Sequence, residues 1–147
     1  MPPVGISVQN RQRKVRFDLE WLRHFARNAV VECVRHAAPE TPLLQLAAVE
    51  VSIVSDAAIA RIHWQFMQIA GATDVITFEH GEIIISGETA INYATEYSQK
   101  LEEELALYII HGLLHLGGFD DVKSSDAKKM RSLQNRILKR LTADILH

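Results

Sequence analysis

Two histidines, His111 and His115, lie four residues apart in a long apolar run of helical length. Residues at this spacing project from the same face of an α-helix, so both imidazoles are expected to point at one spot. The Gly-Gly pair at 117–118 follows, and glycine has the conformational freedom to end a helix and reverse the chain through positive φ. We expect this reversal to bring Asp120 or Asp121 back toward the two histidines.

Two histidines followed by a carboxylate predict an open metal site. Catalytic zinc commonly takes three protein ligands and keeps its fourth position for water or substrate. A helix would supply two ligands and the turn the third. The alternative is that both histidines are core residues whose ring nitrogens are satisfied by neighbours. Gly112 stands where the His-Glu-x-x-His motif carries its general-base glutamate, which argues against ordinary zinc-peptidase chemistry.

The composition is typical of a globular domain. The 147 residues are 48% hydrophobic and 23% charged, which fits one compact domain with a real core. A net charge of −2 does not suggest a uniformly basic nucleic-acid binder, so any nucleic-acid contact must depend on local patches and on the metal. The single cysteine, Cys33, cannot form an internal disulfide, the N-terminus lacks the apolar core of a signal peptide, and no apolar run approaches the length of a transmembrane helix. We therefore expect residues 1–147 to form one cytoplasmic domain.

Strand and helix patterns alternate along the chain. Apolar residues at every second position predict strands near 4–8 and 49–53, and two adjoining strands across a turn at 79–81. Helical spacing predicts helices between the strands, with Asp18 as one N-cap and Ser55 or Asp56 as another. This order predicts an α+β fold in which helices cover a small mixed sheet and the 101–116 helix is buried centrally.

Two of the predicted helices have apolar residues at helical spacing. Tyr93 and Tyr97 are expected in the core, in a helix that follows Gly87 and precedes the histidine helix. The last helix carries an apolar stripe of Met130, Leu133, Ile137, Leu141 and Ile145. Cations outside that stripe could contact a polyanion, although a solvated helix face is the simpler interpretation. The same holds for the basic run at 10–16, which reads as a solvated loop or strand edge.

The run His-Gly-Leu-Leu-His-Leu-Gly-Gly-Phe-Asp at 111–120 resembles the signature of the YbeY family, metal-dependent endoribonucleases associated with ribosomal RNA maturation. Upstream, the segment 73–78 is similar to the family's Thr-Asp-Val-Leu-Ser-Phe block, and 81–83 to its Gly-Asp-Ile. The resemblance spans roughly residues 44–141. Two positions depart from the family: Asp121 stands at its third histidine, and Met67 stands where an arginine is expected.

The resemblance implies a zincin-like fold and one metal-dependent hydrolase domain over 1–147. One zinc ion per chain would be held by His111, His115 and Asp121, and no catalytic residue or general base is assigned. The implied substrate is single-stranded RNA, in particular ribosomal RNA, with a small-subunit ribosomal protein as a partner. The carboxylate of Asp121 makes the metal a weaker Lewis acid than a third histidine would, and Met67 removes a cation that positions phosphate.

Two alternatives stay open at this stage. One is a ribosome-associated RNA-binding protein that keeps the metal site but has little nuclease activity. The other is a metal-dependent hydrolase of a different substrate.

Overall fold

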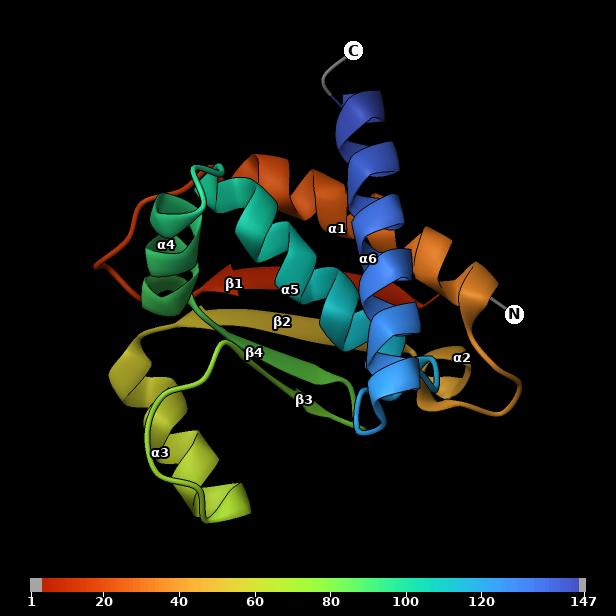
Figure 1. Cartoon of the computed structure of the whole chain (residues 1–147), viewed down its shortest axis with the longest axis horizontal. Coiled ribbons are helices and arrows are strands. Elements are labelled where there is room, and N and C mark those ends of the chain that lie inside the picture. Colours follow the sequence, from red (N-terminus) through yellow and green to blue (C-terminus); the bar gives the residue numbers. More distant parts are fainter. Residues whose placement is uncertain (1–3, 146–147) are drawn as a thin grey trace.

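The computed structural model describes residues 4–145, the last two by their backbone alone. The chain forms a four-stranded mixed sheet with helices on both faces (Figure 1), which confirms the predicted α+β class. The elements are β1 (Gly5–Asn10), α1 (Leu19–His36), α2 (Pro42–Gln45), β2 (Ala48–Val54), α3 (Asp56–Met67), β3 (Val75–Phe78), β4 (Glu82–Ser86), α4 (Gly87–Glu96), α5 (Leu101–Leu116) and α6 (Ser124–Ile145).

The strands lie in the order β1-β2-β4-β3. The first three are parallel to one another, and β3 runs antiparallel to β4 at the edge of the sheet. β3 and β4 form the adjoining pair predicted from the sequence, and the turn between them includes Gly81 at a φ of 107°. This hairpin places β3, the edge strand, beside the helix that carries the two histidines.

The two faces of the sheet bury different sets of apolar side chains. The face that meets α1 and α5 is formed largely by Val49, Val51, Ile53, Ile83 and Ile85. The opposite face contributes Val54, Ile76 and Ile84 to a smaller cluster with Ile59 of α3. Each such side chain contributes roughly 1.5–3 kcal/mol when it is fully buried, so the larger layer between the sheet and α5 dominates the core.

α5 lies at the centre of the fold. It contacts α1, α4 and α6 on its helical sides and β3 and β4 beneath (Figure 1). Gly112 permits the close approach to β4, because a Cβ atom there would lie 2.7 Å from Cδ1 of Ile83. A glutamate therefore does not fit at Gly112, in agreement with the exclusion of His-Glu-x-x-His chemistry.

Local signals in the sequence set most helix ends. Asp18 caps α1 by accepting a hydrogen bond from the backbone N–H of Trp21 at 3.0 Å, and Ser55 rather than Asp56 caps α3. α3 stops at Met67, where Gln68 adopts a left-handed conformation with a φ of 54°. Cys33 is buried, and that burial raises the pKa of its thiol to about 12, so the thiol stays protonated.

The placement of Tyr93 and Tyr97 in the core was wrong. Their side chains are 45% and 62% exposed and stack on each other with ring centroids 6.2 Å apart. α4 packs through its small residues Ala90 and Ala94, which leaves the tyrosine face to solvent. In α6, Met130, Leu133, Ile137 and Leu141 are buried as predicted, while the side chain of Ile145 lies outside the described residues. None of the described helices is both long and apolar enough to cross a bilayer.

Candidate metal centre

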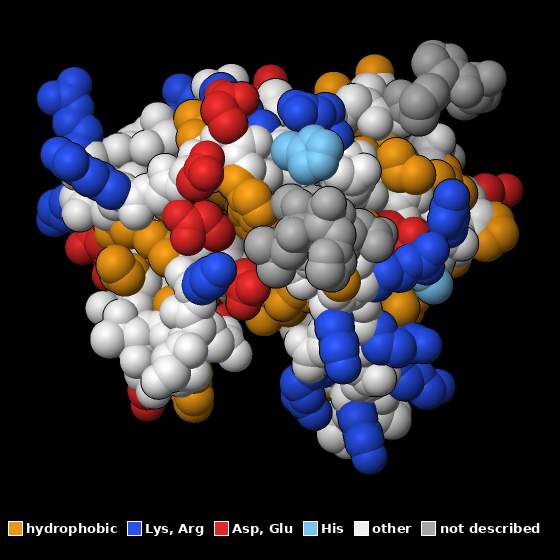
Figure 2. Space-filling model, turned by 90° about the horizontal axis from the view of Figure 1, so that it is seen from above, with side chains coloured by type: hydrophobic (Ala, Val, Ile, Leu, Met, Phe, Trp, Pro, Cys, Tyr) orange, Lys and Arg blue, Asp and Glu red, His pale blue; other side chains and the backbone are white. Residues whose placement is uncertain are grey.

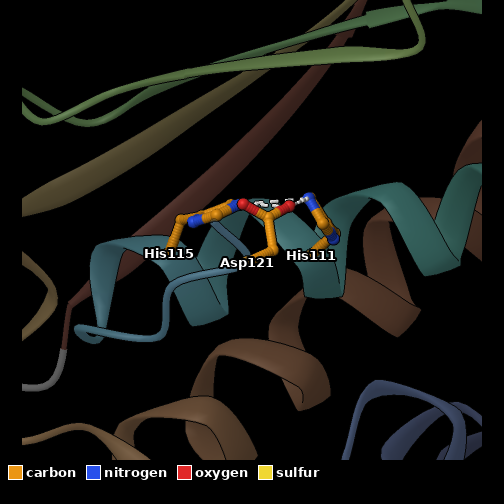
Figure 3. A group of neighbouring side chains, drawn as sticks. All are labelled: His111, His115 and Asp121. Carbon is orange, nitrogen blue, oxygen red and sulfur yellow. Dashed lines mark hydrogen bonds and ion pairs between the residues drawn. The ribbon is translucent and has the colours of Figure 1, made fainter. Parts of the chain in front are cut away.

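Three of the predicted site residues converge at the C-terminal end of α5. His111 and His115 project from one face of the helix, and Asp121 reaches them from the loop that follows (Figure 3). The two Nε2 atoms are 3.0 Å apart, and Oδ2 of Asp121 lies 3.6 Å from each. The structure thus brings together one nitrogen from each ring and one carboxylate oxygen.

Hydrogen bonds on the other side of each ring fix the orientation of the histidines. Nδ1 of His111 lies 3.0 Å from Oε1 of Gln134 in α6, and Nδ1 of His115 lies 3.0 Å from the carbonyl oxygen of Phe119. Both partners are acceptors only, so each Nδ1 carries the proton and donates it. In neutral rings, each Nε2 then presents a lone pair to the centre, which is the tautomer that a metal requires.

The loop after α5 selects between the two adjacent aspartates. Gly118 adopts a φ of 96° and reverses the chain, whereas Gly117 has a φ of −87°, so only one glycine of the pair uses positive φ. Oδ1 of Asp120 accepts a hydrogen bond from the backbone N–H of Val122 at 2.8 Å, which stabilises the turn. Asp121 is the carboxylate that faces the histidines.

The donor set fits a small divalent cation. Two lone pairs at 3.0 Å repel each other unless a proton or a cation lies between them. Ligands of a tetrahedral zinc ion with bonds of 2.0–2.2 Å are about 3.3 Å apart, close to the three separations found here. The side chain of Asp121 is 44% exposed, so the centre is open to solvent on one side.

The two histidines form part of the wall of a cleft of about 420 Å³. The edge strand β3 and the end of α3 form the opposite wall, with Thr73, Val75 and Thr77 among the lining residues. Met67 also lines the cleft, at the position where the family resemblance leads to an arginine. Among the described lining residues there is no lysine or arginine, so the cleft itself offers a phosphate no permanently cationic side chain.

Several residues of the cleft and of the metal centre were not expected from the sequence. His63 lines the cleft from α3, and its Nδ1 donates to the carbonyl oxygen of Gly71 at 3.0 Å. Glu79, interpreted as a turn residue, lies in the turn after β3 and also lines the cleft. No sequence pattern indicated Gln134 either, because its hydrogen bond with His111 depends on the packing of α6 against α5. Only the position of Glu79 in a polar turn near the family block hinted at the cleft.

A buried carboxyl group lies two turns before His111 on α5. Glu104 is 9% exposed, and burial raises the pKa of its carboxyl above the ordinary value of 4.5, with the nearby charge of Asp74 acting in the same direction. The ionised form is therefore disfavoured in the folded protein.

Comparison with known proteins identifies the same family. A family model described as Endoribonuclease YbeY matches residues 7–142. The Endoribonuclease YbeY of Protochlamydia amoebophila is 31% identical over 144 residues, which cover 90% of each chain. That of Myxococcus xanthus is 38% identical over 110 residues, which cover 65% of this chain but 37% of the relative. That of Mycobacterium tuberculosis is 29% identical over 134 residues, covering 78% of this chain and 76% of the relative.

A solved structure has the same architecture. The solution structure of TM1509 from Thermotoga maritima is 25% identical in sequence and superposes with a TM-score of 0.65 over 95% of this chain and 90% of that one. The fold and the named relatives agree, and they support an endoribonuclease role. Because the family model covers nearly the whole chain, this protein belongs to the Endoribonuclease YbeY family.

Proposed function

We propose that this chain is a zinc-dependent endoribonuclease that cuts single-stranded RNA, with His111, His115 and Asp121 as the protein ligands of one zinc ion. The observation that carries the proposal is the pair of inward-facing Nε2 atoms with a carboxylate oxygen 3.6 Å from both, on the wall of an open cleft. Membership of the family supports RNA as the substrate.

The chain's own groups prepare this site for a phosphodiester. A bound zinc ion would supply Lewis acidity at a phosphate oxygen and would lower the pKa of water. Gln134 and the Phe119 carbonyl hold the rings of His111 and His115 in one tautomer and one orientation, so both Nε2 atoms stay directed at the proposed metal position. Thr73 and Thr77 line the cleft; the hydroxyl of Thr73 donates to Oδ1 of Asp74 at 3.4 Å, and that of Thr77 is suited to donate to a phosphate oxygen.

Asp121 distinguishes this site from one with three histidines. Its carboxylate lowers the net charge of the site by one, so the Lewis acid is weaker and catalysis is expected to need a higher pH. The resemblance of the motif supports ribosomal RNA as the substrate, a small-subunit ribosomal protein as a partner, and action in the cytoplasm by residues 1–147 as one domain.

One observation favours a second candidate function. Met67 lines the cleft, and no lysine or arginine does so among the described lining residues, which removes a cation from phosphate positioning. The second candidate is therefore an RNA-binding protein of the ribosome that keeps the metal site and has weak nuclease activity.

Metal content and RNA cleavage, measured on the same preparation, test the proposal. We expect about one zinc ion per chain by elemental analysis and cleavage of a fluorescent single-stranded RNA, with no cleavage of the same sequence in a duplex. His111→Ala should lose both the metal and the activity. Asp120→Asn is the matched control in the loop, because it keeps the acceptor for the backbone N–H of Val122, and it should keep both. A wild-type protein that holds the metal but leaves the RNA intact would favour the second candidate, particularly if Met67→Arg restores cleavage.

A further inference from the structure

A second hollow runs along α6 and shares one wall with the metal cleft. This hollow, the α6 groove, has a volume of about 520 Å³, and its lining includes Phe119, Leu133, Lys128, Lys129 and Arg136. Two serine hydroxyls, those of Ser125 and Ser132, complete it. Ser125, Lys129, Ser132 and Arg136 follow one another at intervals of three or four residues, so they form a continuous stripe along one face of the helix.

Positive charge is concentrated in and beside the α6 groove. Residues 123–140 hold seven of the chain's sixteen Lys and Arg residues and one acid, Asp126, which is a net charge of +6 in a chain of net charge −2. Figure 2 shows Lys and Arg side chains gathered on the lobe at the lower right of the surface. α6, which stands at the right and in front in Figure 1, lies on this side when the molecule is seen from above. A local field of this kind attracts a polyanion even when the whole chain is weakly acidic.

The cations of the groove are not neutralised by neighbours. Among the described side chains, no carboxylate forms an ion pair with Lys128, Lys129 or Arg136. One turn beyond Arg136 the situation changes, because Arg140 forms an ion pair with the buried Glu32 at 3.3 Å. The unpaired stripe therefore extends from the N-terminal end of α6 as far as Arg136.

Phe119 connects the groove to the metal centre. Its side chain is half-buried, and the residue lines both the cleft and the groove, while its carbonyl oxygen accepts the hydrogen bond from Nδ1 of His115. The cleft has no lysine or arginine among its described lining residues, and the groove next to it has three. A sugar-phosphate backbone that extends from the metal centre past Phe119 would therefore lie next to the lysine and arginine side chains of the α6 groove.

We propose that the α6 groove binds the sugar-phosphate backbone of the RNA on one side of the scissile linkage, with Lys129 and Arg136 at phosphate groups. These residues are seven positions apart on the helix, roughly 10 Å along its axis, so they would contact different phosphates, with the hydroxyl of Ser132 between them. This proposal rests on the proposed nuclease function and names the surface that holds the substrate for it.

The salt dependence of RNA binding tests the groove. The probe is a fluorescein-labelled 12-nucleotide 2′-O-methyl RNA, and fluorescence anisotropy gives its association constant between 50 mM and 500 mM salt. The variant is Lys129→Gln with Arg136→Gln. The matched control is Arg13→Gln with Arg16→Gln, two exposed cations in the loop between β1 and α1, on the other side of the molecule (Figure 1).

Log K falls with log salt, and loss of two phosphate contacts should make this negative slope shallower by about 1.4, since each contact to a single strand contributes about −0.7. At 0.1 M salt, with 1 M as reference, this corresponds to binding about 25-fold weaker. The proposal is overturned if both double variants change the slope equally, or if neither changes it. In the latter case the α6 groove does not bind RNA, and an acidic protein surface would be its occupant. Failure of the wild-type protein to cleave RNA would contradict the nuclease proposal separately, because the slope reports binding and not cleavage.

Discussion

Replacement of Gln134 by leucine removes the acceptor that holds the ring of His111. Nδ1 of His111 donates to Oε1 of Gln134 at 3.0 Å, and no other hydrogen-bond partner of that Nδ1 is found among the described residues. Without the acceptor, the ring can rotate or move its proton to Nε2, and an Nε2–H cannot bind a metal. Loss of such an outer partner typically weakens metal binding by about 10–100-fold.

The exposure of the site sets where in that range the effect should fall. The His111 side chain is 25% exposed, so water can partly replace the lost acceptor, and we expect zinc binding about 10-fold weaker, or about 1.4 kcal/mol. Zinc affinity is measured by competition with a chromophoric chelator at fixed pH. Gln134→Glu keeps an acceptor and should bind zinc at least as tightly as the wild type.

Asn135→Leu is the matched control, because it makes the same kind of change at the next, exposed position of α6. It should leave zinc affinity unchanged. The reasoning is refuted if Gln134→Leu binds zinc as tightly as the wild type, or if Asn135→Leu weakens binding equally.

Asp121→Ala should weaken zinc binding by roughly 10-fold or more, because one of three proposed ligands is lost, while Asp121→His should keep the metal and move the pH-activity midpoint downward. The opposite pattern, with Asp120→Ala losing the metal in chelator titrations, would transfer the assignment to the neighbouring residue. Gly112→Ala should destabilise the protein by about 1 kcal/mol in urea denaturation, since overpacking costs about 1–3 kcal/mol against a helix-propensity gain of about 1 kcal/mol. In an Ile83→Ala background the same change should stabilise, because the side chain 2.7 Å from the added Cβ is gone; a loss of equal size in both backgrounds would contradict the clash. Glu104→Gln should raise the melting temperature at pH 7.5 but not at pH 4. The pKa of Glu104 is raised in the folded state, so the wild type loses stability as pH rises from 4.5 through the folded pKa, and the variant does not. A melting-temperature difference that is constant from pH 4 to 7.5 would rule out this explanation.

Local sequence was enough to predict the features that depend on short-range geometry. The helix repeat places His111 and His115 on one face wherever the helix lies, and Asp18 caps α1 through a contact three residues away. The αβ order of the elements and the β3-β4 pair follow from alternation and turn residues for the same reason. The signature at 111–120 then linked these elements to a known family, which the family model confirmed.

Features that depend on packing between distant segments were decided only by the tertiary structure. Gln134 reaches His111 across 23 residues of sequence because the apolar stripe of α6 packs on α5, and periodicity predicts the stripe but not its rotation or contact partner. The same applies to the exposure of Tyr93 and Tyr97, since Ala90 and Ala94 compete with them for the buried side of α4. The orientation of Asp121 rather than Asp120 toward the histidines depends on a positive φ at Gly118 and on the hydrogen bond from Val122. Helix geometry alone thus determined two of the proposed ligands, whereas the third and its supporting contacts required the loop conformation and the docking of α6 on α5.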